Sequence, residues 1–147
     1  MIAYFDASAL VKKYVEEPAS DVVRELLRRV IPTTSRFTAI EVASALARRC
    51  REGDLAAAER DGMLSDLGHD LEAFYVVEVV PDVVEAASRL LLRYPLRSGD
   101  ALQLASCGLI QDKIRGQVQF IAFDGQLNNA AHREGFTTLT PHSPGGW

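Results

Sequence analysis

The chain of 147 residues is long enough for one domain with a single hydrophobic core, and its 48% hydrophobic and 24% charged residues are typical of a globular protein. A net charge of −4 argues against a general polyanion-binding protein, because such proteins are usually basic. No apolar run approaches the roughly 18 residues that span a membrane, and no signal-like basic segment precedes the first strand-like run, so we expect a cytoplasmic protein.

Strand-like apolar runs alternate with segments of helical spacing. In chain order, the predicted elements are strand 2–5, helix 8–16, helix 20–30, strand 31–35, helix 38–52, helix 54–72, strand 74–80, helix 81–92, helix 99–110, strand 119–123, helix 126–134 and strand 136–140. Pro81 is expected in the first turn of its helix, and Gly53 and Gly135 are expected to end theirs. This order predicts one α/β domain over residues 1–140, with a parallel sheet covered on both faces and a short tail at 141–147.

Four acidic residues occupy similar places in this predicted arrangement. Asp6 and Asp124 each follow a predicted strand, whereas Glu41 and Asp100 lie in the first turns of predicted helices. In a parallel α/β sheet, the carboxyl ends of strands and the N-termini of the following helices share one edge, where ligands bind. We therefore expect the four carboxylates to face one cleft.

Each acid also has a purely structural interpretation. Asp6 and Asp124 can cap the helices that follow them by accepting hydrogen bonds from free helix amides. Thr38 and Glu41 fit a capping box in which Glu41 reaches back to the Thr38 amide, and the helix dipole favours Asp100 in a first turn. Since caps accept Ser, Thr and Asn as well, four ionisable acids at four such positions favour a cation site.

Crowded carboxylates need a counter-charge. Two of them about 4 Å apart repel by about 1 kcal/mol in water and by about 4 kcal/mol at an effective dielectric of 20. A divalent cation removes this repulsion, and all-oxygen donors suit Mg²⁺ or Mn²⁺ better than Zn²⁺. Mg²⁺ commonly binds one or two carboxylates together with substrate phosphate oxygens, so such a site can hold a phosphodiester and lower the pKa of an attacking water.

Four segments resemble, in order and spacing, the motifs of PIN-domain proteins: FDASALVKKY, TAIEVASAL, LRSGDALQLAS and FIAFDGQLNNAA. The resemblance extends from about Ile2 to Leu139, and the short single-domain form is similar to VapC-type toxin ribonucleases of toxin–antitoxin pairs. It implies a three-layer α/β/α sandwich with a mainly parallel sheet, and a metal-dependent endoribonuclease that uses Mg²⁺ or Mn²⁺. It also implies a homodimer, and an antitoxin protein that blocks the cleft.

The same resemblance implies roles for individual residues. Asp6, Glu41, Asp100 and Asp124 match the catalytic acids that hold or surround the metal, and Ser8 matches a hydroxyl that organises the site, with a plain first-turn helix residue as the alternative. Near the fourth motif, where many relatives carry a further acid, this chain has Gly125, Gln126, Asn128 and Asn129. That departure disfavours a second metal and a direct bond from Asp124 to the metal.

An RNA substrate would also need positive contacts. Arg97, which precedes Asp100, is the preferred substrate-binding or site-organising residue. Further candidates, each with a solvated helix face as the alternative, are Lys12, Lys13, Arg48, Arg49 and Arg51. The histidines form no evident pair for metal-free acid–base catalysis, and they are His69, His132 and His142. The two cysteines, Cys50 and Cys107, lack metal-ligand spacing and are expected to be reduced.

Two other classes of function remain open. Asp6 could be the nucleophile of a phosphatase of the haloacid dehalogenase type, but those enzymes usually have a second Asp two residues later, where this chain has Ser8. Alternatively, the domain could be a non-catalytic partner-binding module that keeps the acids as helix caps. The apolar faces of helices 8–16 and 20–30 are expected to be mostly core, with a smaller part open to an antitoxin helix.

Overall fold

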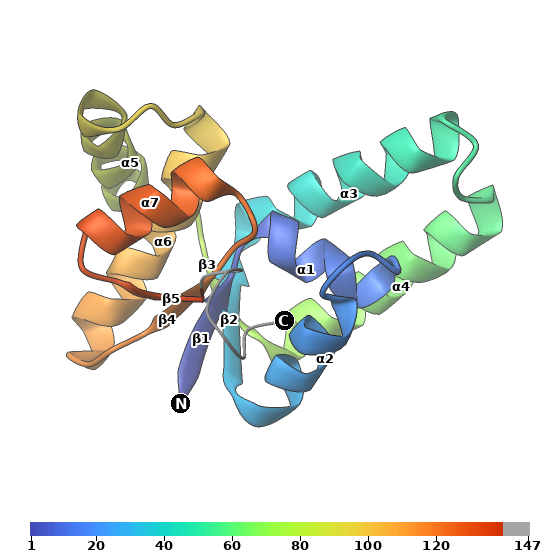
Figure 1. Cartoon of the computed structure of the whole chain (residues 1–147), viewed down its shortest axis with the longest axis horizontal. Helices are drawn as coiled ribbons and strands as arrows, with labels where there is room; N and C mark the ends of the chain where they lie inside the picture. Colours follow the sequence, from blue (N-terminus) through green and yellow to red (C-terminus); the bar gives the residue numbers. More distant parts are fainter. Residues whose placement is uncertain (140–147) are drawn as a thin grey trace.

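The computed structural model describes residues 1–139, which form a three-layer α/β/α sandwich around a parallel sheet (Figure 1). The strand order is β3-β2-β1-β4-β5, with β1 (Ile2–Phe5), β2 (Ile31–Ser35), β3 (Tyr75–Val77), β4 (Gln119–Ile121) and β5 (Thr137–Thr138). All four strand pairings are parallel. The chain therefore adds β2 and β3 on one side of β1 and then crosses to add β4 and β5 on the other. The boundary between β1 and β4 is a topological switch point, where α/β sheets bind ligands.

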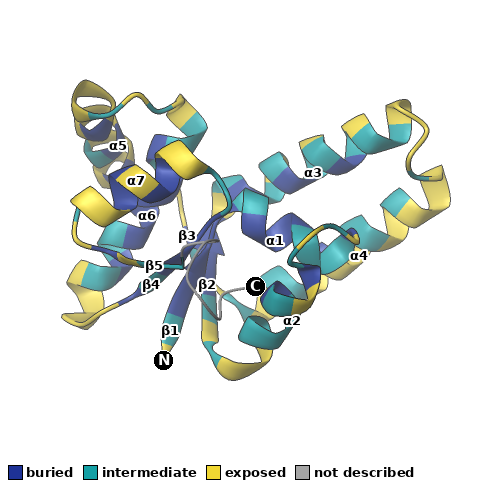
Figure 2. Cartoon of the chain, in the orientation of Figure 1, coloured by how far each residue is buried: buried dark blue, intermediate teal, exposed yellow. Residues whose placement is uncertain are grey.

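The helices cover both faces of the sheet, as expected from the alternation of elements. They are α1 (Ala7–Tyr14), α2 (Ser20–Arg29), α3 (Arg36–Arg51), α4 (Ala57–Ala73), α5 (Pro81–Arg93), α6 (Ser98–Ile114) and α7 (Gly125–Arg133). Buried residues of α1 to α4 form one hydrophobic cluster with one face of the sheet, and buried residues of α5 to α7 form a second cluster with the other face. The inner strands β1, β2 and β4 are mostly dark in the burial view because both of their faces are covered, whereas the edge strands β3 and β5 are mainly intermediate or exposed (Figure 2).

Strand β1 shows how the sequence divides its residues between the two clusters. Ala3 and Phe5 lie in the cluster with α1 to α4, whereas Tyr4 points to the opposite face and lies in the other cluster. Tyr4 stacks on Phe120 of β4 with ring centroids 5.7 Å apart. This period-2 alternation between two apolar faces explains why β1 reads as one continuous apolar run.

Three of the predicted strands end earlier than the sequence suggests, including β5, which ends at Thr138. β3 stops at Val77 because the next residues turn, with the Val80 N–H bonded to the Glu78 carbonyl. β4 stops at Ile121 because the backbone groups of the next two residues form hydrogen bonds with side chains. The Ser8 hydroxyl accepts the N–H of Phe123, and the carbonyl of Ala122 accepts from the Asn128 side chain.

Helices α3 and α4 project together beyond the edge of the sheet as a two-helix arm (Figure 1). Gly53 ends α3 as predicted, with a φ of 85° that a side chain would strain, and its N–H bonds to the Cys50 carbonyl. Gly135 ends α7 in the same way, with a φ of 88°. Pro81 occupies the first turn of α5, also as predicted.

Several other predictions can be read directly from the fold. Within residues 1–139, no helix is both long and apolar enough to cross a bilayer. Both cysteines are free, and burial raises the pKa of the Cys107 thiol. Leu10 and Val23 of α1 and α2 are fully buried, so they belong to the core. The tail predicted at 141–147 lies outside the described residues.

Candidate active site

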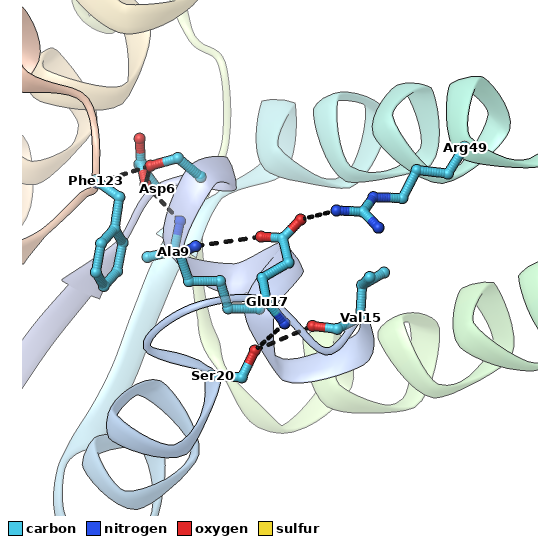
Figure 3. A network of polar contacts seen from close by, with 9 residues as sticks. Asp6, Ala9, Val15, Glu17, Ser20, Arg49 and Phe123 are labelled. Carbon is cyan, nitrogen blue, oxygen red and sulfur yellow. Dashed lines mark hydrogen bonds and ion pairs between the residues drawn. The ribbon is translucent and has the colours of Figure 1, made fainter. Parts of the chain in front are cut away.

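Asp6 lies directly after β1, at the switch point of the sheet, and is only 4% exposed. Its Oδ1 accepts hydrogen bonds from the Ala9 backbone N–H at 2.9 Å and from the Ser8 hydroxyl at 2.7 Å (Figure 3). Burial, with a smaller contribution from the charges of Glu41 and Asp100, raises the pKa of the Asp6 carboxyl to about 7 in spite of these two bonds. Asp6 therefore caps α1 and is also a buried acid whose ionised form is disfavoured.

Ser8 connects Asp6 to the neighbouring strand. Its hydroxyl donates to Asp6 and accepts the backbone N–H of Phe123 at 2.9 Å. Phe123 follows β4, so one side chain holds together the two loops that leave the sheet at the switch point (Figure 3). The loop of Asp6 is thereby fixed against the loop that carries Asp124.

Glu41 is not part of a capping box, and this corrects one of the structural interpretations of the acids. The Ser35 hydroxyl caps α3 by accepting the Phe37 N–H at 3.0 Å, so the helix begins at Arg36, earlier than the sequence suggests. Glu41 consequently lies beyond the first turn, and its Oε1 accepts from the Gln103 side chain at 2.6 Å. Partial burial raises the pKa of Glu41, the Gln103 hydrogen bond opposes this, and the charge of Asp100 adds to the rise.

Gln103 is a residue of this site that the sequence reasoning missed. It is 1% exposed on α6, and its amide oxygen accepts from the Tyr4 hydroxyl at 2.5 Å and from the Thr38 hydroxyl at 3.1 Å. Its amide nitrogen donates to Glu41. The available signal was a polar residue inside the apolar run ALQLA, three positions after Asp100 and hence on the same helix face.

Asp100 and Asp124 complete the acidic set from two further helix starts. Asp100 lies in the first turn of α6, where partial burial and the charge of Asp124 raise its pKa and Arg97 opposes the rise. Asp124 caps α7, with its Oδ1 accepting the Leu127 N–H at 2.9 Å. The Arg97 Nε lies 3.7 Å from Asp100 Oδ2, and its side chain is 86% exposed at the rim. Both acids can serve as structural residues and still face the cavity.

All four carboxylates line a single cavity of about 880 Å³. The charges of Glu41 and Asp100 raise the pKa of Asp6, and the charge of Asp100 also raises the pKa of Glu41. The charge of Asp124 in turn raises the pKa of Asp100, so the acids form one electrostatic group. Within residues 1–139, however, no three acidic, histidine or cysteine side chains converge closely enough to form a ready-made metal-binding cluster. The arrangement suits a hydrated ion, since Mg²⁺ keeps several waters and commonly uses only one or two carboxylates.

The positive candidates divide into two groups in the structure. Lys12, Arg48, Arg49 and Arg97 line the same cavity as the acids. Lys13 instead pairs with Asp70 of α4, away from the cavity. Of the histidines, His69 and His132 are exposed and do not line the cavity, and His142 lies outside the described residues.

Gly99 brings α6 close to the acidic group. A Cβ added there would lie 3.1 Å from the Phe37 ring and 3.3 Å from a carboxylate oxygen of Glu41. Gly99 has no positive φ, so the requirement is space and not backbone conformation. The glycine next to Asp100 therefore allows Glu41 and the start of α6 to approach each other.

Comparisons with known proteins identify the family of this chain. The model of the family described as "PIN domain" matches residues 3–133, which is most of the chain. The chain belongs to the PIN-domain family. Among curated proteins, Ribonuclease VapC45 of Mycobacterium tuberculosis is 34% identical over 139 residues, covering 91% of this chain and 92% of the relative. The resemblance in the sequence motifs is thus confirmed.

Two solved structures show the PIN fold at lower sequence identity. The M. tuberculosis toxin VapC20, described as cleaving the sarcin–ricin loop, has a TM-score of 0.67 and 21% identity, and the match covers 92% of this chain and 96% of that one. A toxin–antitoxin complex from Klebsiella pneumoniae matches with a TM-score of 0.64 and 17% identity, covering 97% and 99% of the two chains. These likenesses confirm the predicted three-layer sandwich.

Proposed function

We propose that this PIN-domain protein is a metal-dependent endoribonuclease and the toxin of a toxin–antitoxin pair. The observation that carries the proposal is the buried Asp6, whose pKa is raised to about 7 inside a cavity that it shares with Glu41, Asp100 and Asp124. A relative that covers almost the whole chain is a VapC ribonuclease, which supports RNA as the substrate. Perturbed carboxylates in one cavity are typical of catalytic sites.

The donor set fits Mg²⁺ or Mn²⁺. Every candidate ligand is a carboxylate oxygen, and hard oxygen donors favour these ions over softer metals. We assign Asp6, Glu41 and Asp100 to hold the ion directly or through waters, and Asp124 to the outer part of the site. When bound, the ion would neutralise phosphate charge and lower the pKa of a water.

The protein residues would orient this chemistry. Ser8 and the Ala9 N–H keep the Asp6 carboxylate in one position, and Gln103 does the same for Glu41. Arg97 at the rim is placed to contact a phosphate of the incoming strand. Hydrolysis of the bond between phosphorus and the 3′ oxygen would leave a 5′-phosphate and a 3′-hydroxyl.

The partners follow from the same assignment. VapC ribonucleases are relatives at 34% identity, and a toxin–antitoxin complex shares the fold. We therefore assign to this protein an antitoxin that blocks the cavity, a homodimeric state, and action in the cytoplasm, where the RNA is. With Leu10 and Val23 in the core, an antitoxin would contact more exposed parts of α1 to α4.

The decisive test is RNA cleavage by Asp100→Asn and its matched control Asp112→Asn on the same helix. Wild type with Mn²⁺ should cut single-stranded RNA, and Asp100→Asn should lose at least about 100-fold in rate, since it removes a group that stabilises the transition state. Asp112 is exposed and outside the cavity, so its variant should cut normally. Gel assays with mapping of the cut ends measure both results.

The alternatives have distinct outcomes in this assay. Protein that binds an antitoxin but leaves all RNA intact would support a non-catalytic module. Trapping of an aspartyl-phosphate, which is an acyl phosphate, on Asp6 would support a phosphatase. Ends that carry a 2′,3′-cyclic phosphate would contradict hydrolysis by water.

A second prediction concerns the close approach at Gly99. Gly99→Ala should lower the cleavage rate about tenfold, because the new methyl group pushes against Phe37 and Glu41 and small misplacements of reacting groups are costly. Gly108→Ala is the matched control on the same helix, since its added carbon would meet only an ordinary 3.7 Å contact with Phe136. The control should keep its activity and gain up to about 1 kcal/mol of stability from helix propensity. Equal activities of the two variants would contradict the prediction.

A further inference from the structure

Glu17 lies in the wall of the cavity with a cation on either side (Figure 3). One carboxylate oxygen accepts from the Lys12 ammonium of α1 at 3.2 Å, and the other accepts from the Arg49 guanidinium of α3. The side chains of Glu17 and Lys12 are only 18% and 12% exposed. These charges are withdrawn from solvent far more than ordinary surface ion pairs are.

The loop between α1 and α2 holds Glu17 in this position. The Ser20 hydroxyl, which is buried, accepts the Glu17 N–H at 2.9 Å and donates to the Val15 carbonyl at 3.1 Å (Figure 3). Ala19 has a φ of 70°, a left-handed conformation that residues with a side chain seldom adopt. The backbone of Glu17 is thus fixed by a buried hydroxyl and a tight turn, and its carboxylate is directed at the two cations.

Of the two paired cations, Lys12 lies near the acidic group. Lys12 Nζ is 4.8 Å from the centroid of the Phe123 ring, and the Phe123 N–H is bonded to Ser8, which bonds Asp6. Arg48 is different. It also lines the cavity and is exposed, and within residues 1–139 it makes no ion pair with a carboxylate.

We propose that Glu17 is an internal competitor of the substrate phosphates. Its carboxylate occupies Lys12 and Arg49, so that these two cations are withheld from a bound polynucleotide and Arg48 carries the phosphate contact at this end of the cavity. Carboxylates and phosphates accept hydrogen bonds from the same cationic donors, so one anion excludes the other. The identity of the polynucleotide as RNA rests on the proposed function, whereas the competition itself concerns any phosphate backbone.

The test compares Glu17→Gln with Glu16→Gln, which removes the same charge one residue away. Glu16 is exposed, pairs with Arg24 and does not line the cavity. Binding of a fluorescent 12-nucleotide single-stranded RNA, and of the DNA of the same sequence, is measured in EDTA from 50 to 200 mM salt, with the oligonucleotide checked for integrity.

Glu17→Gln should bind more tightly at low salt and depend more steeply on salt. Each new phosphate contact on a single strand adds about 0.7 to the slope of log K against log salt, so two released cations add up to about 1.4. Over the fourfold salt range this is about a sevenfold larger loss of affinity than in wild type. Glu16→Gln should keep the wild-type slope, and weaker or unchanged binding by Glu17→Gln would overturn the proposal.

A second pair of variants tests the proposal without touching Glu17. Arg48→Ala should lower the slope by about 0.7, because it removes a phosphate contact, whereas Arg49→Ala should leave the slope unchanged. The two variants remove the same charge from adjacent positions of α3. Equal slope losses in both would show that Arg49 already contacts the phosphates and would overturn the proposal, even if Glu17→Gln did not fold.

The outcomes separate this inference from the proposed function. A wild type that cuts no RNA, but whose Glu17→Gln variant binds both oligonucleotides with the steeper slope, would contradict the ribonuclease assignment and support the competition. If wild type cuts RNA but the two pairs of variants show no difference in slope, the ribonuclease assignment is supported and the competition is contradicted. Failure of every variant to bind either oligonucleotide would overturn the competition.

Discussion

Replacement of Asp6 by asparagine is expected to abolish RNA cleavage and to make the metal-free protein more stable at neutral pH. Asparagine keeps a side-chain oxygen that can accept from the Ala9 N–H, so the cap of α1 is retained. It lacks the negative charge that burial and the neighbouring acids disfavour. Loss of function and gain of stability in one variant would show that the acid is kept for chemistry.

The sign of the pH dependence follows from the direction of the pKa shift. The pKa of Asp6 rises from 3.8 to about 7 on folding, so between these values the folded protein binds more protons than the unfolded chain. Asp6 therefore makes stability fall as the pH rises from about 4 to 7. One pKa unit corresponds to about 1.4 kcal/mol. At pH values above 7, the free energy of unfolding of Asp6→Asn can therefore exceed that of wild type by at most roughly 4 kcal/mol. The difference should vanish near pH 4.

Thermal and urea unfolding from pH 4 to 8 in EDTA measure this effect. Asp21→Asn is the matched control, since the Asp21 side chain is 96% exposed and its removal changes the net charge equally. Mn²⁺ should restore stability to wild type by mass action, by about 2.7 kcal/mol at a hundred times its Kd, and should stabilise Asp6→Asn much less. An Asp6→Asn variant that is strongly destabilised at every pH would instead identify Asp6 as a structural cap alone.

The second large effect is expected for Gln103→Leu, which should lower the free energy of unfolding by about 2 to 4 kcal/mol and also reduce cleavage. Leucine is similar in size but offers no polar atom to Tyr4, Thr38 or Glu41. A buried polar group that loses its partner costs about 1 to 3 kcal/mol, and the Tyr4 hydroxyl is fully buried. Glu41 would at the same time lose the hydrogen bond that fixes its carboxylate.

The double variant Tyr4→Phe/Gln103→Leu separates the loss of stability from the loss of cleavage. Removing the Tyr4 hydroxyl as well eliminates one of the unsatisfied groups, so the double variant should be less destabilised than the sum of the single variants. Cleavage by the double variant should stay low, because Glu41 is still unsupported. Gln126→Leu, on the exposed start of α7, should change neither quantity. Full activity of Gln103→Leu would show that Glu41 needs no support from α6.

Much of the candidate site could be predicted because it depends on position along the chain. Asp6 and Asp124 follow strands, and Asp100 opens a helix, so parallel topology alone places their side chains at one edge of the sheet. Glu41 was expected at that edge for a wrong reason, because the helix was thought to begin at Thr38. Its actual start at Arg36 depends on the Ser35 hydroxyl, which caps the helix.

Pairings between distant segments could not be predicted. Glu17 reads in the sequence as one of two adjacent glutamates before a proline, but in the structure it neutralises Lys12 and Arg49, two of the expected phosphate contacts. Gln103 meets Glu41 across 62 positions of the chain. Nothing local distinguishes Glu17 from Glu16 or Arg49 from Arg48.

The sequence by itself determined the order of the elements, the parallel α/β class and the position of Asp6, Asp100 and Asp124 at one edge, because hydrophobic periodicity and the positions of strand ends are local properties. Only the tertiary structure decided which polar groups are buried together, which acids have raised pKa values and which cations are already neutralised. Burial and charge pairing depend on the distances between side chains from separate segments, and packing of the two helical layers on the sheet sets those distances.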